Sequence, residues 1–269
     1  AYEADLIVPI NRVKLHTDFV GPIQSGLCKM LVIGLGNHKG CSAVHEEAPE
    51  VFADAIEETA RLILQKAPVG FGIAILENAY DKTYAVEAVP AEHLVEREKE
   101  LVQIAKGNMP YIMLDEADVI VCGAIGKDIS GAGFDPNILG RSSVLKQFVL
   151  HIPRYQRLVL CDVTPASHGN GIGVGLFDVI TKKVAEQLDL ESMYANAIAC
   201  NCLGDASVPC TVDDEETAIR VALKCCRNID RDHPRIIRIQ NTLHLGEIEV
   251  SEALLDAVRA DSRMSLIEN

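Results

Sequence analysis

The chain has 269 residues, enough for one large domain or two of ordinary size. Its apolar content of 48% is far above that of disordered chains, and because aromatic residues make up only 4%, aliphatic side chains have to build the core. The 25 basic residues are outnumbered by 39 acidic ones, and the resulting charge of −14 argues against nucleic acid as a partner, because phosphate groups repel it.

Strand and helix patterns alternate through the first part of the chain. Apolar, β-branched residues over 5–13 predict a strand, and a compact apolar stretch over 25–35 predicts a helix with Ser25 as its N-cap. The pattern continues with amphipathic helices over 49–66 and 92–106, on either side of two strands over 69–76 and 83–89.

The second part of the chain keeps this alternation. A fully apolar strand over 117–122 is followed by a glycine-rich connection over 123–141. Strands are then expected over 157–163 and 236–242, and helices over 176–187, 213–227 and 251–259.

Such alternation is typical of an α/β fold in which helices cover the sheets on both faces. We predict two mixed α/β domains, one over 1–116, to which 236–269 returns, and one over 117–235. Because Ala1 stands within the approach to a strand, we expect an N-terminal portion of the protein to precede it. Apolar runs such as 30–35 are far shorter than the roughly 20 residues of a membrane-spanning helix, so no membrane is expected.

The nine cysteines indicate a reducing compartment. Their odd number and apolar contexts, as at Cys122 and Cys161, favour reduced thiols in a cytoplasmic protein. Cys200 and Cys202 together with Cys210 offer a metal-binding alternative, although zinc sites usually use a CxxC pair at each end. We favour small buried hydrophobes, the usual role of free cysteine.

Titratable residues gather among glycines soon after the first expected strand, and each has two interpretations. His16 is either a catalytic residue or a turn residue satisfied by Asp18. Lys29, in an apolar segment, either extends its amine to water or is a desolvated nucleophile. His45 is either a ligand or a surface residue beside two glutamates. Glycine lets backbone N–H groups approach a ligand, and ligands of open α/β sheets bind beyond the carboxyl ends of strands.

Taken together, the run from Asn11 to His45 resembles the nickel-pincer lactate racemase family. The resemblance is carried by His16-Thr-Asp, Gly21-Pro-Ile-Gln-Ser-Gly-Leu-Cys-Lys29-Met and Ile33-Gly-Leu-Gly-Asn-His-Lys-Gly40. In that family a lysine is tied through a thioamide to a pyridinium mononucleotide with a thiocarboxylate arm that carries nickel. A histidine sixteen residues later ligates the nickel. The resemblance therefore implies Lys29 as the covalent cofactor site and His45 as the metal ligand, within a cofactor-anchoring first domain.

The resemblance also implies a reaction, the racemisation or epimerisation of a small 2-hydroxy acid. A histidine removes the hydroxyl proton while a hydride moves to the cofactor, and both then return with the opposite stereochemistry. A histidine near its ordinary pKa of about 6.5 serves in either direction, and His16 matches one of the family's two acid/base histidines. The other would lie upstream, so we expect the chain by itself to be inactive.

The glycine-rich connection over 126–141 resembles a loop of the same family. Four of its residues offer charges and amides for a carboxylate and hydroxyls: Lys127, Asp135, Asn137 and Arg141. Arg141 suits a bidentate carboxylate clamp. Equally, all four serve to brace the long loop.

Two other functions remain open. One is a metal-dependent dehydratase of sugar or hydroxy acids with zinc or magnesium, which would leave Lys29 unmodified. The other is an inactive homologue that binds hydroxy acids without exchanging the hydrogen on the reacting carbon.

Overall fold

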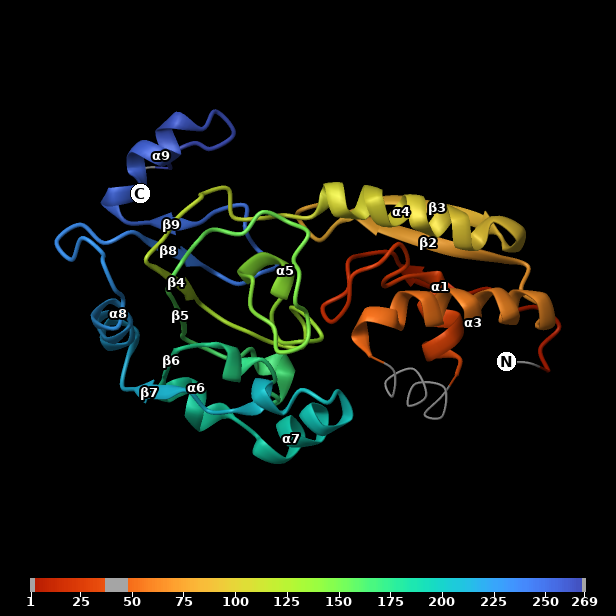
Figure 1. Cartoon of the computed structure of the whole chain (residues 1–269), viewed down its shortest axis with the longest axis horizontal. Coiled ribbons are helices and arrows are strands. Elements are labelled where there is room, and N and C mark those ends of the chain that lie inside the picture. The colour runs from red at the N-terminus through yellow and green to blue at the C-terminus, as the bar shows by residue number, and fades with distance from the viewer. Residues whose placement is uncertain (1–2, 37–47, 268–269) are drawn as a thin grey trace. The chain divides into compact units, whose positions relative to one another are not determined.

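The computed structural model describes residues 3–36 and 48–267, and the chain forms two compact units (Figure 1). Unit 1 comprises Ala1–Pro110 and Val144–Val149, and unit 2 comprises Tyr111–Ser143 and Leu150–Asn269. The predicted α/β class is confirmed, because a three-stranded sheet in unit 1 and a six-stranded sheet in unit 2 each occur with helices. Within these ranges no helix is both long and apolar enough to cross a membrane.

Unit 1 contains a small mixed sheet in the order β1-β2-β3, with β1 parallel and β3 antiparallel to β2. Its strands are β1 (Ile10–Arg12), β2 (Phe71–Glu77) and β3 (Thr83–Pro90). Its helices are α1 (Leu27–Lys29), continued by a π-helical segment (Met30–Gly34), then α3 (Phe52–Lys66) and α4 (Leu94–Asn108), the last two entered through the 3-10 turns Pro49–Val51 and Ala91–His93.

The helices of unit 1 pack on β2 at Gly72, where the strand presents only a hydrogen atom in place of a side chain. A Cβ on Gly72 would lie 2.6 Å from a methyl group of Leu27 of α1 and 3.2 Å from a methyl group of Leu94 of α4, so a larger residue would force both leucine side chains to move. The predicted cap of the first helix is wrong, because the N-cap position is Gly26. Helix α3 buries Phe52, Ala53, Ile56 and Ala60, whereas Leu62 is 49% exposed.

Unit 2 is built on a sheet in the order β7-β6-β5-β4-β8-β9, parallel throughout except for β9 at one edge. Its strands are β4 (Val119–Cys122), β5 (Arg157–Leu160), β6 (Val179–Thr181), β7 (Cys210–Val212), β8 (Ile236–Ile239) and β9 (Glu249–Val250). Its helices are α5 (Pro136–Leu139), α6 (Lys182–Gln187), α7 (Leu190–Ala199), α8 (Glu215–Lys224) and α9 (Leu255–Ala260), with 3-10 turns at Pro165–Ser167, Val174–Leu176, Leu203–Ala206 and Glu252–Leu254.

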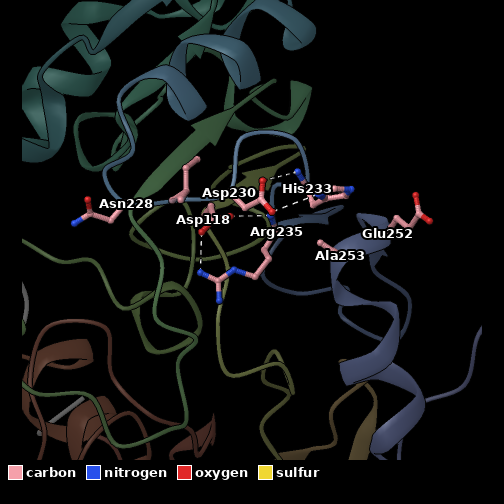
Figure 2. Close-up of a pocket in the computed structure, with 8 residues that line it drawn as sticks. Asp118, Asn228, Asp230, His233, Arg235, Glu252 and Ala253 are labelled. Atoms are coloured by element: carbon pink, nitrogen blue, oxygen red, sulfur yellow. Dashed lines mark hydrogen bonds and ion pairs between the residues drawn. The ribbon is translucent and has the colours of Figure 1, made fainter.

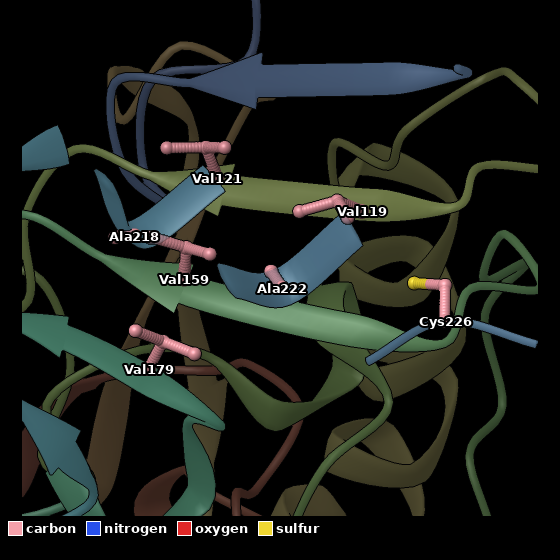
Figure 3. Close-up of a cluster of buried hydrophobic side chains, with 7 residues drawn as sticks. All are labelled: Val119, Val121, Val159, Val179, Ala218, Ala222 and Cys226. Atoms are coloured by element: carbon pink, nitrogen blue, oxygen red, sulfur yellow. The ribbon is translucent and has the colours of Figure 1, made fainter. Parts of the chain in front are cut away.

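The core of unit 2 lies between α8 and the middle of the sheet (Figure 3). Small side chains on α8, Ala218 and Ala222, let the helix approach β4, β5 and β6 closely. The helix begins where Asp214 accepts a hydrogen bond from the backbone N–H of Thr217 at 2.7 Å, which satisfies one of the first-turn donors. The buried strand residues against it are Val119, Val121, Val159 and Val179.

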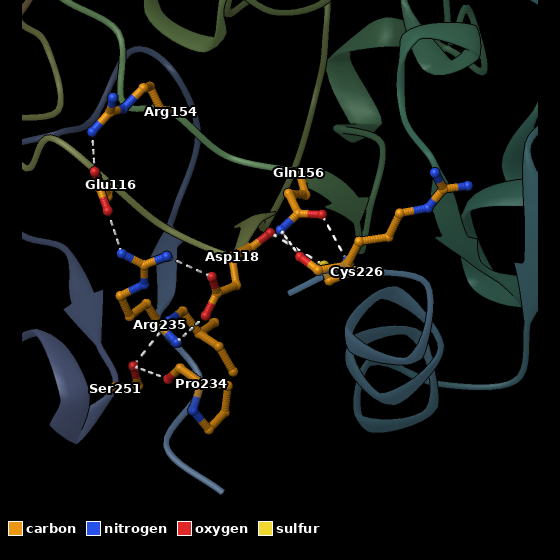
Figure 4. Close-up of polar contacts among 10 residues, drawn as sticks. Glu116, Asp118, Arg154, Gln156, Cys226, Pro234, Arg235 and Ser251 are labelled. Carbon is orange, nitrogen blue, oxygen red and sulfur yellow. Dashed lines mark hydrogen bonds and ion pairs between the residues drawn. The ribbon is translucent and has the colours of Figure 1, made fainter. Parts of the chain in front are cut away.

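A buried carboxylate ties the start of β4 to the start of β8 (Figure 4). Asp118 accepts hydrogen bonds from the backbone N–H of Arg235 and from its guanidinium, both at 2.8 Å. The guanidinium also pairs with Glu116, which is in turn paired with Arg154. The Asp118 side chain is 2% exposed and that of Arg235 is 38% exposed, so the pair joins a buried carboxylate to a partly exposed guanidinium.

Three sequence predictions need correction in unit 2. The segment 236–269 does not return to the first domain, because β8 pairs with β4. The division between the units falls after Pro110 rather than after residue 116. The expected helix over 176–187 begins only at Lys182, because β-branched residues of β6 are fully buried between β5 and β7.

The cysteines are less uniformly buried than expected. Cys28 and Cys122 are buried, and burial raises the pKa of the Cys122 thiol to about 12, so it is a neutral core residue. Cys200, Cys210 and Cys225 are exposed, which contradicts the prediction of small buried hydrophobes at these three positions.

Candidate functional site

The structure brings His16 and Lys29 together in unit 1. Both belong to the run of titratable residues and glycines that follows the first expected strand of the sequence. The chain leaves β1, forms a loop and closes on itself where Lys14 and Ser25 exchange backbone hydrogen bonds of 3.0 and 3.2 Å. This bridge returns the chain to the helix that carries Lys29. The Nε2 atom of His16 contacts Nζ of Lys29 across the closed loop.

The His16 side chain is held firmly and is only 8% exposed. Its ring stacks on Phe19, with centroids 4.3 Å apart and planes inclined by 27°. Its backbone N–H donates to Oε1 of Gln24 at 2.8 Å, and Gln24 donates to the carbonyl of Gly21 at 3.1 Å. These contacts fix the position of the ring, so the loop determines which ring edge faces Lys29.

The hydrogen bonds of the ring define its tautomer. The backbone N–H of Asp18 donates to Nδ1 of His16 at 3.0 Å, so Nδ1 bears a lone pair and the neutral ring carries its proton on Nε2. That proton points at Nζ of Lys29, so the amine has to accept it. Both contacts are satisfied together only when Lys29 is an uncharged amine, the nucleophilic form of lysine.

His45 lies within 37–47, outside the described residues. In the ranges that the structure does describe, no three histidine, cysteine or acidic side chains stand close enough to hold a metal ion.

The four residues predicted to bind substrate lie in unit 2, where their contacts favour the alternative that they brace the loop. Asp135 caps α5 by accepting hydrogen bonds from the backbone and side-chain amides of Asn137 at 2.9 and 3.1 Å. Lys127 donates to the carbonyl of Gly131 at 2.6 Å.

Arg141 does clamp a carboxylate, but one from its own chain. Its guanidinium pairs with Asp178 at 2.7 Å and donates to the carbonyl of Leu176 at 3.0 Å. The same group lies over the ring of Tyr155, 5.3 Å from its centroid. A substrate would have to displace Asp178, so the geometry favours a structural role for Arg141.

The glycines of this loop differ in what they tolerate, which gives a first prediction. Gly133 has φ +87°, and a Cβ there would lie 2.1 Å from the carbonyl oxygen of Ile172. Gly133→Ala should therefore lower the free energy of unfolding by at least about 2 kcal/mol, because left-handed backbone alone costs about 1–2 kcal/mol. Gly131 has open space at its Cβ position, so Gly131→Ala is the matched control and should change little. Urea denaturation measures both, and equal effects would contradict the argument.

Two pockets of unit 2 lie at opposite ends of its parallel strands. Figure 2 shows one at the amino ends, where Asp118 and Arg235 lie beside a His233–Asp230 pair 3.3 Å apart. The other lies at the carboxyl ends, the edge where open sheets bind ligands, but its charges pair with each other, Asp162 with Lys183 and Glu215 with Arg238. Neither is lined by a described residue of the predicted site.

Sequence reasoning missed one residue beside Lys29, the fully buried Glu98 of α4. A signal was present, because Glu98 occupies a position of the apolar stripe that buries Leu94, Val95, Leu101 and Val102. Comparison of the chain with protein-family models, with curated proteins and with solved structures found no match.

Proposed function

We propose that the protein racemises or epimerises a 2-hydroxy acid in the cytoplasm, with a nickel-pincer nucleotide attached covalently to Lys29. The single observation that carries the proposal is the contact between Nε2 of His16 and Nζ of Lys29. In this contact a histidine, a side chain suited to acid/base chemistry, lies directly beside the amine that the sequence resemblance implies as the attachment point.

The residues present fit such a group. An uncharged amine is the form that can be acylated, and the hydrogen bonds of His16 require that form of Lys29. The Lys29 side chain is partly exposed at the end of α1, so it is accessible for modification. When bound, the cofactor supplies the hydride acceptor and donor, whereas the protein supplies orientation and proton transfer.

The proton transfer follows from the same geometry. Once the Lys29 nitrogen is part of an amide, it no longer accepts a hydrogen bond, so the ring proton of His16 can move to Nδ1. The carboxylate of Asp18 lies 4.0 Å from Nδ1, and after a small movement of this partly exposed side chain it accepts a hydrogen bond from that N–H. Nε2 then bears the lone pair and removes the proton from the substrate hydroxyl.

The test is the intact mass, nickel content and turnover of the full-length protein, produced together with the enzymes that synthesise the cofactor. Wild type should carry nickel and an adduct that maps to Lys29, and Lys29→Ala should carry neither. His16→Ala should keep the adduct but lower turnover by about 100- to 10,000-fold, the usual contribution of a general acid/base. Lys14→Ala, an exposed lysine of the same segment, is the matched control and should behave as wild type.

Two results would contradict the proposal. Unmodified Lys29 without nickel, under conditions that load a known racemase, would favour the metal-dependent dehydratase if zinc or magnesium supports turnover, and the hydroxy-acid-binding protein if none does. Loss of nickel from His16→Ala as complete as from Lys29→Ala would contradict the separate roles of the two residues.

A further inference from the structure

A carboxyl group is buried beneath the helix that presents Lys29. Glu98 of α4 is 0% exposed and its Oε2 accepts a hydrogen bond from the backbone N–H of Cys28 at 2.9 Å. This N–H belongs to the first turn of α1, whose donors have no partner within the helix. Glu98 supplies the missing acceptor from a different helix, 70 positions further along the chain.

The backbone is shaped to admit this carboxyl. A Cβ on Gly26 would lie 2.5 Å from Oε1 and 2.6 Å from the carboxyl carbon of Glu98, so only glycine leaves room for the group. Oε1 is buried, and within the described part of the chain it has no hydrogen-bond partner. A buried oxygen without a partner is costly, which argues for a function of the carboxyl beyond packing.

We propose that Glu98 is a positioning residue for Lys29, because its carboxyl anchors the first turn of the helix that holds the amine against His16. The inference rests on the proposed function only in that Lys29 is the reactive group. The carboxyl acts through the backbone of Cys28, one residue before Lys29, so a change at Glu98 alters where the amine stands.

The charge of Glu98 changes near neutral pH. Burial raises its pKa to about 7, although the backbone N–H groups of Cys28 and Leu27 act in the opposite direction. Burial also raises the pKa of the Cys28 thiol, which stays protonated. Six other charged groups on the elements packed here form ion pairs: Glu57 and Arg61 on α3, Glu87 on β3, and Glu96, Arg97 and Lys99 on α4. Protonation of Glu98 thus couples pH to the anchoring of the Lys29 helix.

The experiment measures how fast acetic anhydride, at trace amounts, acetylates Lys29 of the cofactor-free protein between pH 5.5 and 9, with peptide mass mapping. Lys66, in the last turn of α3, is the internal reference. In wild type, Lys29 should react at least about tenfold faster than Lys66 at pH 6, as an uncharged amine does, and its profile should show an additional step near pH 7. Glu98→Gln keeps an acceptor for the Cys28 N–H but cannot ionise, so it should keep the rate at pH 6 and lose the step.

Two further variants separate positioning from general stability. Glu98→Ala removes the anchor and should bring the Lys29 rate down to that of Lys66. Leu101→Ala removes a fully buried side chain of the same helix without touching the anchor, and should keep both the rate and the step. A step that persists in Glu98→Gln, or an equal loss of rate in Leu101→Ala, would overturn the proposal. Because no cofactor or substrate is used, failure to find nickel on Lys29 would refute the proposed function and leave this result standing.

Discussion

Arg235→Met should lower the free energy of unfolding of unit 2 by about 3 kcal/mol. The substitution keeps the apolar stem but leaves the buried carboxylate of Asp118 without its counterion. Removing one partner of a buried pair costs about 3–5 kcal/mol, and the lower value is expected because the Arg235 side chain is 38% exposed. The backbone N–H of Arg235 still donates to Asp118 in the variant, which further limits the loss.

The matched control is Arg154→Met, because Arg154 pairs with Glu116 of the same network but is 81% exposed. It should change stability by less than about 1 kcal/mol, since surface ion pairs contribute little. The chain has no tryptophan, so urea denaturation is followed by circular dichroism. Equal losses in the two variants would show that burial of Asp118 does not determine the strength of the network.

Wild type should lose stability relative to Glu98→Gln as the pH rises from 4.5 to 8. The pKa of Glu98 is about 7 in the folded protein against an ordinary value of 4.5, so between these values the folded state binds the proton more strongly than the unfolded state does. Stability from this group is complete below pH 4.5 and is lost as the pH rises through 7. A difference of about 2.5 pKa units at 1.36 kcal/mol each amounts to about 3 kcal/mol.

The measurement is the free energy of unfolding of both proteins at several pH values in one buffer series. Other carboxyl groups titrate in both proteins, including Glu57, whose pKa is lowered because Lys99 and Arg61 together outweigh the opposite effect of burial. Their contributions cancel in the difference between the variants. A difference that stays constant from pH 4.5 to 8 would mean that Glu98 is ionised throughout and that the buried carboxyl does not titrate near neutrality.

The sequence predicted the long amphipathic elements of this fold and the four-residue strands β4, β5 and β8, but it missed the shorter strands β6, β7 and β9. Helices α3, α4 and α8 and the β2–β3 pair have clear periods of burial, and all were expected close to their observed positions. β6 and β7 have three residues each, too few for any period. The place of β8 beside β4 is a pairing between residues more than a hundred positions apart, which local pattern does not encode.

The candidate site was predicted in part for a similar reason. Lys29 and His16 lie thirteen positions apart in one glycine-containing run, so their contact is nearly local. Glu98 reaches the site from a distant helix, and its position on an apolar stripe was the sole indication of its burial. The predicted role of Arg141 depended on its having no acidic partner in the protein, whereas Asp178, 37 positions away, provides one.

The π-helical segment after Lys29 has a consequence for the ancestry of the protein. The backbone N–H of Leu35 donates to the carbonyl of Met30 at 2.9 Å, five positions back instead of four, so this turn contains one residue more than an α-helical turn. Inserting a single residue into an ordinary α-helix would produce a turn of this kind. Each residue turns a helix by about 100°, so deleting one would rotate everything beyond Gly34 by that angle relative to Lys29. Related proteins with and without this extra residue would therefore align with a shift of one position after Lys29. They would also present different side chains to Lys29.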